Sequence, residues 1–195
     1  VLRNNRLKTG LYSSNEMARR FYKFAEYWII GGLFKRSYFV ENKFKNDVIA
    51  GDWILAFSLL KYGRVAYVNE VLSGFRIHER QREAKVLYDR ALINHELERA
   101  QKHDYIIEDV ALLEAIGITK QFAQNEKRKE CSLAIITIIR KFHRSLISKE
   151  SVDEIFLKTN PSQYGFLANL LANNYNSKIC YYFTFFASQF LSLDF

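Results

Sequence analysis

Apolar positions follow one another almost without interruption from Trp53 to Tyr62. A helix that has no polar face is buried in a protein core. Gly63 follows this run at the place where a glycine ends a helix. Asp52 precedes the run as an N-cap, where its carboxylate can accept hydrogen bonds from free backbone N–H groups. The pattern therefore predicts a buried helix that begins with an outward-facing carboxylate.

Two short extended segments follow this helix. Arg64–Val68 has the composition of a strand, and Val71–Ile77 can extend again after a turn. Arg76 and His78 alternate with Ile77, so their side chains project to the same face of the second segment. A guanidinium and an imidazole on one face suit a phosphate or a metal-bound phosphate. The sequence predicts a strand pair that carries a basic pair at its far end.

The chain before residue 51 carries one helix signal and one glycine pair. Ser13 and Glu16 have the spacing of a capping box, which starts a helix. The aromatic and β-branched run Tyr27–Ile30 then stops at Gly31 and Gly32. This pattern predicts a short buried extended segment that enters a tight backbone passage.

The chain after residue 80 is helical in composition. The predicted helices, with their start and stop signals, are Gln81–His103, Ile106–Ile116 ended by Gly117, a long helix from Thr119 to a basic end at Arg144, one begun by a capping box at Ser151 and Glu154 and broken at Pro161, and Tyr164–Asn173. His95, His103 and His143 fall within these helices, and we expect them to be solvated residues rather than ligands.

The tail, residues 179–195, is dense in phenylalanine and tyrosine. Two interpretations stay open. One is a terminal helix that closes the core. The other is an interfacial helix or a partner surface, since aromatic residues and basic segments suit an anionic membrane face. The tail is too short and too polar to span a bilayer.

Composition narrows the possible partners without choosing among them. The 195 residues carry a net charge of +8, which favours nucleic acid, acidic lipid or phosphorylated small molecules. The Lys and Arg residues are dispersed and form no recognised motif, which argues against nucleic acid. The two cysteines are 49 positions apart (131 to 180), which indicates neither a zinc site nor a disulfide framework and fits a reducing compartment.

The order of these elements resembles a known family. Gly-Gly-Leu-Phe-Lys-Arg-Ser, followed by Gly-Asp-Trp-Ile-Leu-Ala-Phe and by Phe-Arg-Ile-His, is similar to the acceptor-side half of a family 2 glycosyltransferase. The resemblance covers Trp28–Arg80. It implies the α/β GT-A fold, in which a nucleotide-binding half precedes an acceptor-binding half. It also implies that residues 1–80 form the acceptor-side half and that residues 81–195 form a helical C-terminal extension, which makes the chain mainly helical.

On the acceptor side, the resemblance assigns Asp52 as the general base of an inverting enzyme. Such a base removes the proton from the acceptor hydroxyl as that hydroxyl attacks the anomeric carbon. Trp53 lies where the family places an aromatic residue beside the acceptor sugar, and Gly31 and Gly32 match the floor of the acceptor site. Many family members carry Glu before the base, whereas this chain has Gly51.

On the donor side, the resemblance places Arg76 and His78 at the diphosphate of the nucleotide-sugar, with His78 in reach of a metal. The family implies a divalent cation, Mg²⁺ or Mn²⁺, held by a D-x-D motif. No Asp-x-Asp occurs in this sequence, and the chain begins with Val1 rather than Met. We therefore expect a catalytic fragment that lacks the nucleotide-binding half.

The implied function is transfer of a sugar, of the hexosyltransferase type, from a nucleotide-sugar to a hydroxyl of a glycan or a lipid-linked acceptor. The setting would be polysaccharide or glycoconjugate synthesis, with a cytoplasmic enzyme at the inner face of the membrane. The alternative is a non-catalytic basic helical module that binds protein, a membrane surface or nucleic acid.

Overall fold

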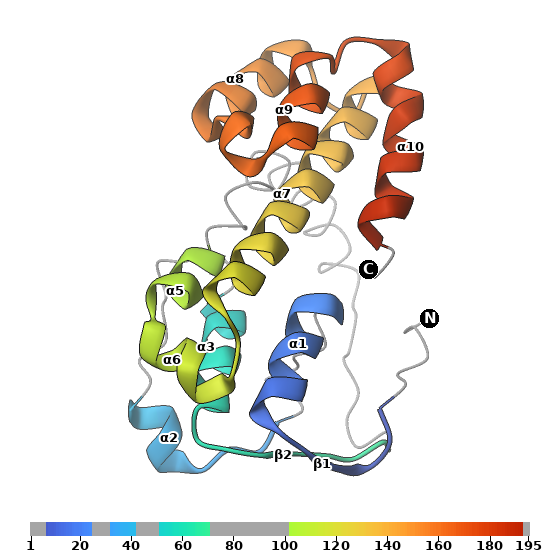
Figure 1. Cartoon of the computed structure of the whole chain (residues 1–195). Helices are drawn as coiled ribbons and strands as arrows, with labels where there is room; N and C mark the ends of the chain where they lie inside the picture. Colours follow the sequence, from blue (N-terminus) through green and yellow to red (C-terminus); the bar gives the residue numbers. More distant parts are fainter. Residues whose placement is uncertain (1–6, 25–31, 42–50, 71–101, 193–195) are drawn as a thin grey trace, which may run out of the picture. The chain divides into compact units, whose positions relative to one another are not determined.

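The computed structural model describes residues 7–24, 32–41, 51–70 and 102–192 (Figure 1). This part of the chain is mainly helical and contains one two-stranded sheet. The expectation of a mainly helical chain is confirmed.

The chain divides into two compact units. The first comprises residues 1–76 and 104–123, and the second comprises residues 77–103 and 124–195. The domain boundary predicted at residue 80 lies outside the described residues. Residues 104–123, which the sequence assigned to the helical extension, belong to the first unit.

The first unit contains the sheet and most of the shorter helices. Its elements are β1 (Gly10–Tyr12), α1 (Ser14–Phe24), α2 (Arg36–Glu41), α3 (Gly51–Leu60), β2 (Val65–Tyr67) and α6 (Val110–Ile116). Two further helices, α5 (Lys102–Glu108) and α7 (Lys120–His143), run across the division between the units.

The predicted strand after α3 is confirmed as β2, but its partner is new. β2 pairs with β1 in antiparallel register, with Gly10 opposite Tyr67 and Tyr12 opposite Val65. The sequence signal for β1 is weak because the strand has only three residues and begins with glycine. The predicted partner strand, Val71–Ile77, lies outside the described residues.

The core of the first unit is built around α3, as predicted. Five of its seven buried residues pack in one cluster with the buried residues of α1 and α6, and Phe57 meets Phe21 of α1 with ring centroids 5.5 Å apart. The capping box of α1 is confirmed: the Ser13 backbone N–H donates to Glu16 Oε2 at 2.9 Å, and the Glu16 backbone N–H donates to Ser13 Oγ at 3.3 Å. The first unit therefore follows its local sequence signals closely.

The single helix predicted at Ile106–Ile116 is wrong, because the chain forms α5 and α6 there. The break falls at Asp109, whose carboxylate accepts a hydrogen bond from the Leu112 backbone N–H at 2.9 Å and so caps α6. Gly117 ends α6 with a φ of 68°, as predicted. Glycine suits this left-handed position because it has no Cβ.

The second unit contains the long helix and the C-terminal helices. After α7 come α8 (Lys149–Thr159), the 3₁₀ turn η4 (Pro161–Tyr164), α9 (Phe166–Asn173) and α10 (Lys178–Ser192). Their core is a cluster of buried residues from α7, α8, α9 and α10. The tail prediction of a terminal helix that closes the core is confirmed for α10, because Cys180 and Ala187 belong to this cluster.

The predicted start of α8 is wrong by one turn. The N-cap is Ser148, whose Oγ accepts a hydrogen bond from the Ser151 backbone N–H at 3.2 Å. Ser151 itself lies inside the helix. The helix therefore begins at Lys149 and has one turn more than predicted before its buried side chains, Val152 and Ile155.

Among the described residues, no helix combines the length and the apolar character needed to cross a membrane.

Candidate functional site

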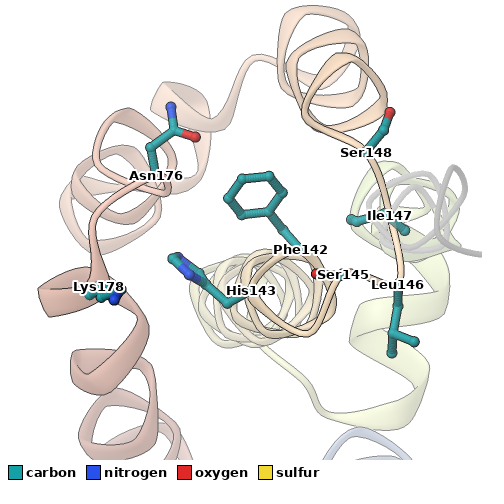
Figure 2. A pocket seen from close by; sticks show the side chains of 8 residues that line it. All are labelled: Phe142, His143, Ser145, Leu146, Ile147, Ser148, Asn176 and Lys178. Atoms are coloured by element: carbon teal, nitrogen blue, oxygen red, sulfur yellow. The ribbon is translucent and has the colours of Figure 1, made fainter.

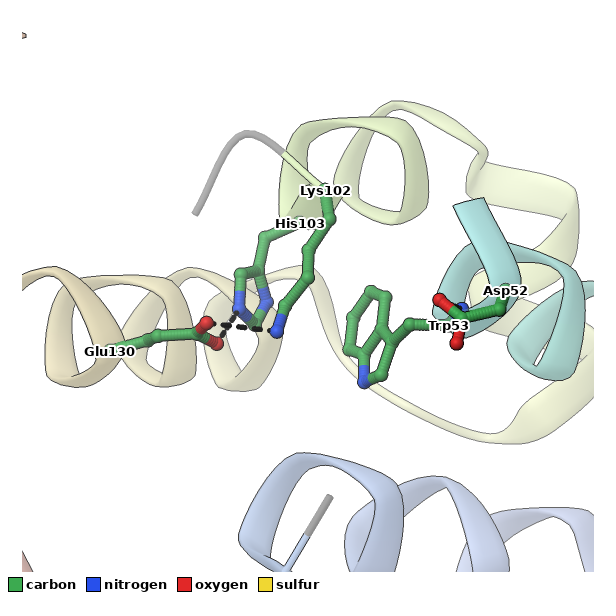
Figure 3. Close-up of polar contacts among 5 residues, drawn as sticks. All are labelled: Asp52, Trp53, Lys102, His103 and Glu130. Atoms are coloured by element: carbon green, nitrogen blue, oxygen red, sulfur yellow. Dashed lines mark hydrogen bonds and ion pairs between the residues drawn. The ribbon is translucent and has the colours of Figure 1, made fainter. Parts of the chain in front are cut away.

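Asp52 lies in the first turn of α3, and it is exposed (Figure 3). The helix begins one residue earlier, at Gly51, so Asp52 is not the N-cap. Its Oδ1 accepts a hydrogen bond from the Trp53 backbone N–H at 2.9 Å. A carboxylate in the first turn also interacts favourably with the helix dipole. The predicted arrangement, an outward carboxylate at the start of a buried helix, is therefore present.

Trp53 occupies the core rather than a surface. Its side chain is 1% exposed, and its ring lies against Phe57 and Tyr22 with centroids 4.2 Å and 5.5 Å away. A ring that is buried on all sides has no surface to offer a sugar. The predicted contact between Trp53 and an acceptor therefore has no support in this structure.

Gly32 is half-buried and is followed by an irregular, exposed segment, residues 33–35, that leads into α2. The Phe34 ring lies so close to it that a side chain at position 32 would displace the ring. The buried extended segment predicted at Tyr27–Ile30 lies outside the described residues, so the tight passage stays a prediction. Gly31, Arg76 and His78 lie outside the described residues, so their roles stay predictions.

An aromatic pair joins α2 to the end of α3, and the sequence did not indicate it. The rings of Tyr38 and Tyr62 stack with centroids 4.0 Å apart and an angle of 3° between their planes. The Tyr62 hydroxyl donates to Glu41 Oε2 at 2.6 Å. Lys35 and Lys61 lie over the two rings, at 5.4 Å and 5.0 Å from the centroids. The pair holds α2, which begins four residues after Gly32, against the turn that follows α3.

A buried charge network in the second unit corrects the prediction for His103. His103 is 2% exposed, not solvated, and its Nε2 lies 2.6 Å from Glu130 Oε2 (Figure 3). Lys102 is also buried, and its Nζ donates to Glu130 Oε1 at 2.8 Å. One carboxylate therefore serves two neighbouring basic side chains on α5.

The network sets the ionisation of Glu130. Burial by itself raises the pKa of this carboxyl, but the hydrogen bond from His103 and the positive charge of Lys102 outweigh burial and lower the pKa from 4.5 to about 2. An ionised carboxylate only accepts hydrogen bonds, so the proton between the two groups belongs to His103 Nε2. Within the second unit, this network is a structural ion cluster that ties α5 to α7.

His143 is half-buried at the end of α7, where its Nε2 lies 2.7 Å from the Tyr175 carbonyl oxygen. It lines an open pocket of about 650 Å³ (Figure 2). The other lining residues come from the end of α7, the connection to α8 and the start of α10: Phe142, Ser145, Leu146, Ile147, Ser148, Asn176 and Lys178. The pocket offers hydroxyl, amide and cationic groups, and its lining contains no carboxylate.

A metal site is not assembled in the described part of the chain, where no group of three His, Cys, Asp or Glu residues could hold an ion. His78, which the resemblance places in reach of the divalent cation, lies outside the described residues, so the cation stays a prediction. Both cysteines are buried, and burial raises the pKa of the Cys180 thiol.

Comparison of the chain with protein-family models, with curated proteins and with solved structures finds no match.

Proposed function

We propose that this chain forms the acceptor-side part of an inverting family 2 glycosyltransferase with the GT-A fold. One observation carries the proposal. Of the ten residues of α3, all of which are described, Asp52 is the one that is exposed. A reactive carboxylate on a rigid, buried helix has the fixed position that a catalytic group needs.

In the proposed reaction, the Asp52 carboxylate accepts the proton of an acceptor hydroxyl. The hydroxyl oxygen forms a bond to the anomeric carbon of the donor sugar. The bond between that carbon and the diphosphate breaks, and its electron pair leaves with the nucleoside diphosphate. Arg76 and His78 are proposed to stabilise the negative charge on this leaving group.

The backbone contact of Asp52 makes a clean test possible. Asparagine at position 52 keeps a side-chain oxygen that can accept from the Trp53 N–H, so Asp52→Asn preserves the hydrogen bond and removes the base. Turnover should be measured on the full-length protein as nucleoside diphosphate release from a panel of nucleotide-sugars, with Mg²⁺ or Mn²⁺ supplied. We expect Asp52→Asn to lower turnover by about 100-fold or more, with an unchanged circular dichroism spectrum.

Glu114→Gln is the matched control, because Glu114 is an exposed carboxylate on α6 of the same unit. It should retain full turnover. If the two variants have equal turnover, Asp52 is not the base.

The runner-up is a non-catalytic basic helical module. It is favoured by the exposed apolar side chains of α10, which are typical of a binding surface and take no part in the proposed transfer. If no nucleotide-sugar in the panel is turned over and none binds, this second candidate replaces the first.

A further inference from the structure

One face of α10 is apolar and exposed. The side chains on this face are between 44% and 81% exposed. They are spaced three, four and seven residues apart, which places them in one stripe along the helix. The outer stripe consists of Ile179, Tyr182, Phe183 and Phe186. Large apolar side chains gathered on one surface mark an interaction site.

The exposure of this stripe is fixed by how α10 is held against α7. The Arg140 guanidinium donates to Thr184 Oγ1 at 3.1 Å, to the Thr184 carbonyl oxygen at 2.8 Å and to Ser188 Oγ at 2.9 Å. It also lies 4.4 Å from the centroid of the Phe185 ring. Thr184 is completely buried. These contacts fix the rotation of α10 about its axis, so the outer stripe does not turn into the core.

Basic side chains gather at the end of α10 where the pocket opens. Three exposed cations form this basic end: Arg144 and Lys149 on either side of the connection that lines the pocket, and Lys178 in its lining. No Asp or Glu occurs between Arg140 and Lys149, nor within α10, and the nearest carboxylate in the sequence is Glu150. The outer stripe therefore starts beside a surface of positive charge.

We propose that α10 docks onto an anionic lipid bilayer, with the outer stripe in the interfacial layer and the basic end against the headgroups. Aromatic side chains bind at the boundary between headgroups and acyl chains, and each nearby cation adds attraction to anionic lipid. An anionic bilayer offers a counterpart to both surfaces at once: the headgroup and acyl-chain boundary for the outer stripe and negative charge for the basic end. The proposal does not depend on the glycosyltransferase assignment.

The test is co-sedimentation of the protein with vesicles of phosphatidylcholine, with and without phosphatidylglycerol. We expect binding to the anionic vesicles that weakens as salt is raised. Tyr182→Ser and Phe186→Ser should each lower the partition coefficient by about tenfold. Arg144→Gln and Lys178→Gln should each lower it by about fivefold on anionic vesicles only. Phe166→Ser is the control, because Phe166 is 82% exposed on α9 and lies outside the stripe.

Three outcomes would overturn the proposal. The first is that the protein with its natural sequence gives a helical circular dichroism spectrum but does not bind anionic vesicles. The second is an equal loss of binding in Phe166→Ser and in the stripe variants. The third is a concentration-dependent dimer that Tyr182→Ser and Phe186→Ser dissociate, which would assign the stripe to a second copy of the chain.

Discussion

Replacing Glu130 with glutamine tests the buried network directly, because the change keeps the shape of the side chain and removes its charge. The variant leaves Lys102 and His103 buried without their anion. The difference between the ordinary pKa of 4.5 and the lowered pKa of about 2 corresponds to at most about 3.4 kcal/mol. The Glu130 side chain is 33% exposed, so solvent screening reduces this figure. We expect the free energy of unfolding at pH 7 to fall by about 1–2 kcal/mol.

The pH dependence gives this prediction a sign. The pKa of Glu130 is lower in the folded protein than in the unfolded chain, so the unfolded chain binds the proton more readily. The stabilisation is fully present above pH 4.5 and is lost as the pH falls toward about 2. The difference in unfolding free energy between the natural protein and Glu130→Gln should therefore shrink as the pH falls from about 4.5 toward 2.

The measurement is urea unfolding followed by far-ultraviolet circular dichroism at a series of pH values. Glu154→Gln is the matched control: its carboxylate pairs with Lys158 at 2.7 Å in the same unit, but both side chains are about two-thirds exposed. The control should change stability within the error of the measurement, since exposed ion pairs contribute little. The reasoning is refuted if Glu130→Gln is as stable as the natural protein at pH 7, or if its deficit is independent of pH.

Two further predictions concern helix ends. Gly117→Ala places a Cβ 3.1 Å from Asn15 Nδ2 at a residue with a φ of 68°, so thermal unfolding should show that the free energy of unfolding falls by about 1–2 kcal/mol. Gly10→Ala is the control, because its Cβ would make ordinary contacts at 3.7 Å, and its stability should be nearly unchanged. Ser148→Ala removes the N-cap of α8 and should cost about 1 kcal/mol, while Ser151→Ala keeps the capped N–H and should cost less; equal losses would contradict the assigned cap.

Short-range signals predicted much of the first unit. The spacing of Ser13 and Glu16 predicts the start of α1, and the apolar run after Asp52 predicts the buried helix α3. Each of these features is decided within a few residues of the chain. The exposed carboxylate of Asp52 follows from the same local pattern, because Asp52 is the polar residue at the start of an otherwise apolar helix.

The failures come from competition between signals or from distant contacts. Ser151 and Glu154 match a capping box, yet Ser148 caps α8, and capping motifs can recur one turn apart. The burial of His103 depends on Glu130, which lies 27 residues away on another helix. Spacing along the chain carries no information about such partners.

The positive net charge of the chain has a different meaning once the second unit is described. Lys102 is used internally to balance Glu130, and Arg140 is used internally to hold α10. These two cations are committed to structure, so they are not available to a partner. The exposed cations Arg144, Lys149 and Lys178 converge instead on one end of the unit, beside the outer stripe. Folding therefore commits some of the dispersed Lys and Arg residues to internal contacts and leaves others exposed beside the outer stripe. This localisation favours an anionic surface as the partner over a small phosphorylated ligand, which would need convergent donors within a closed pocket.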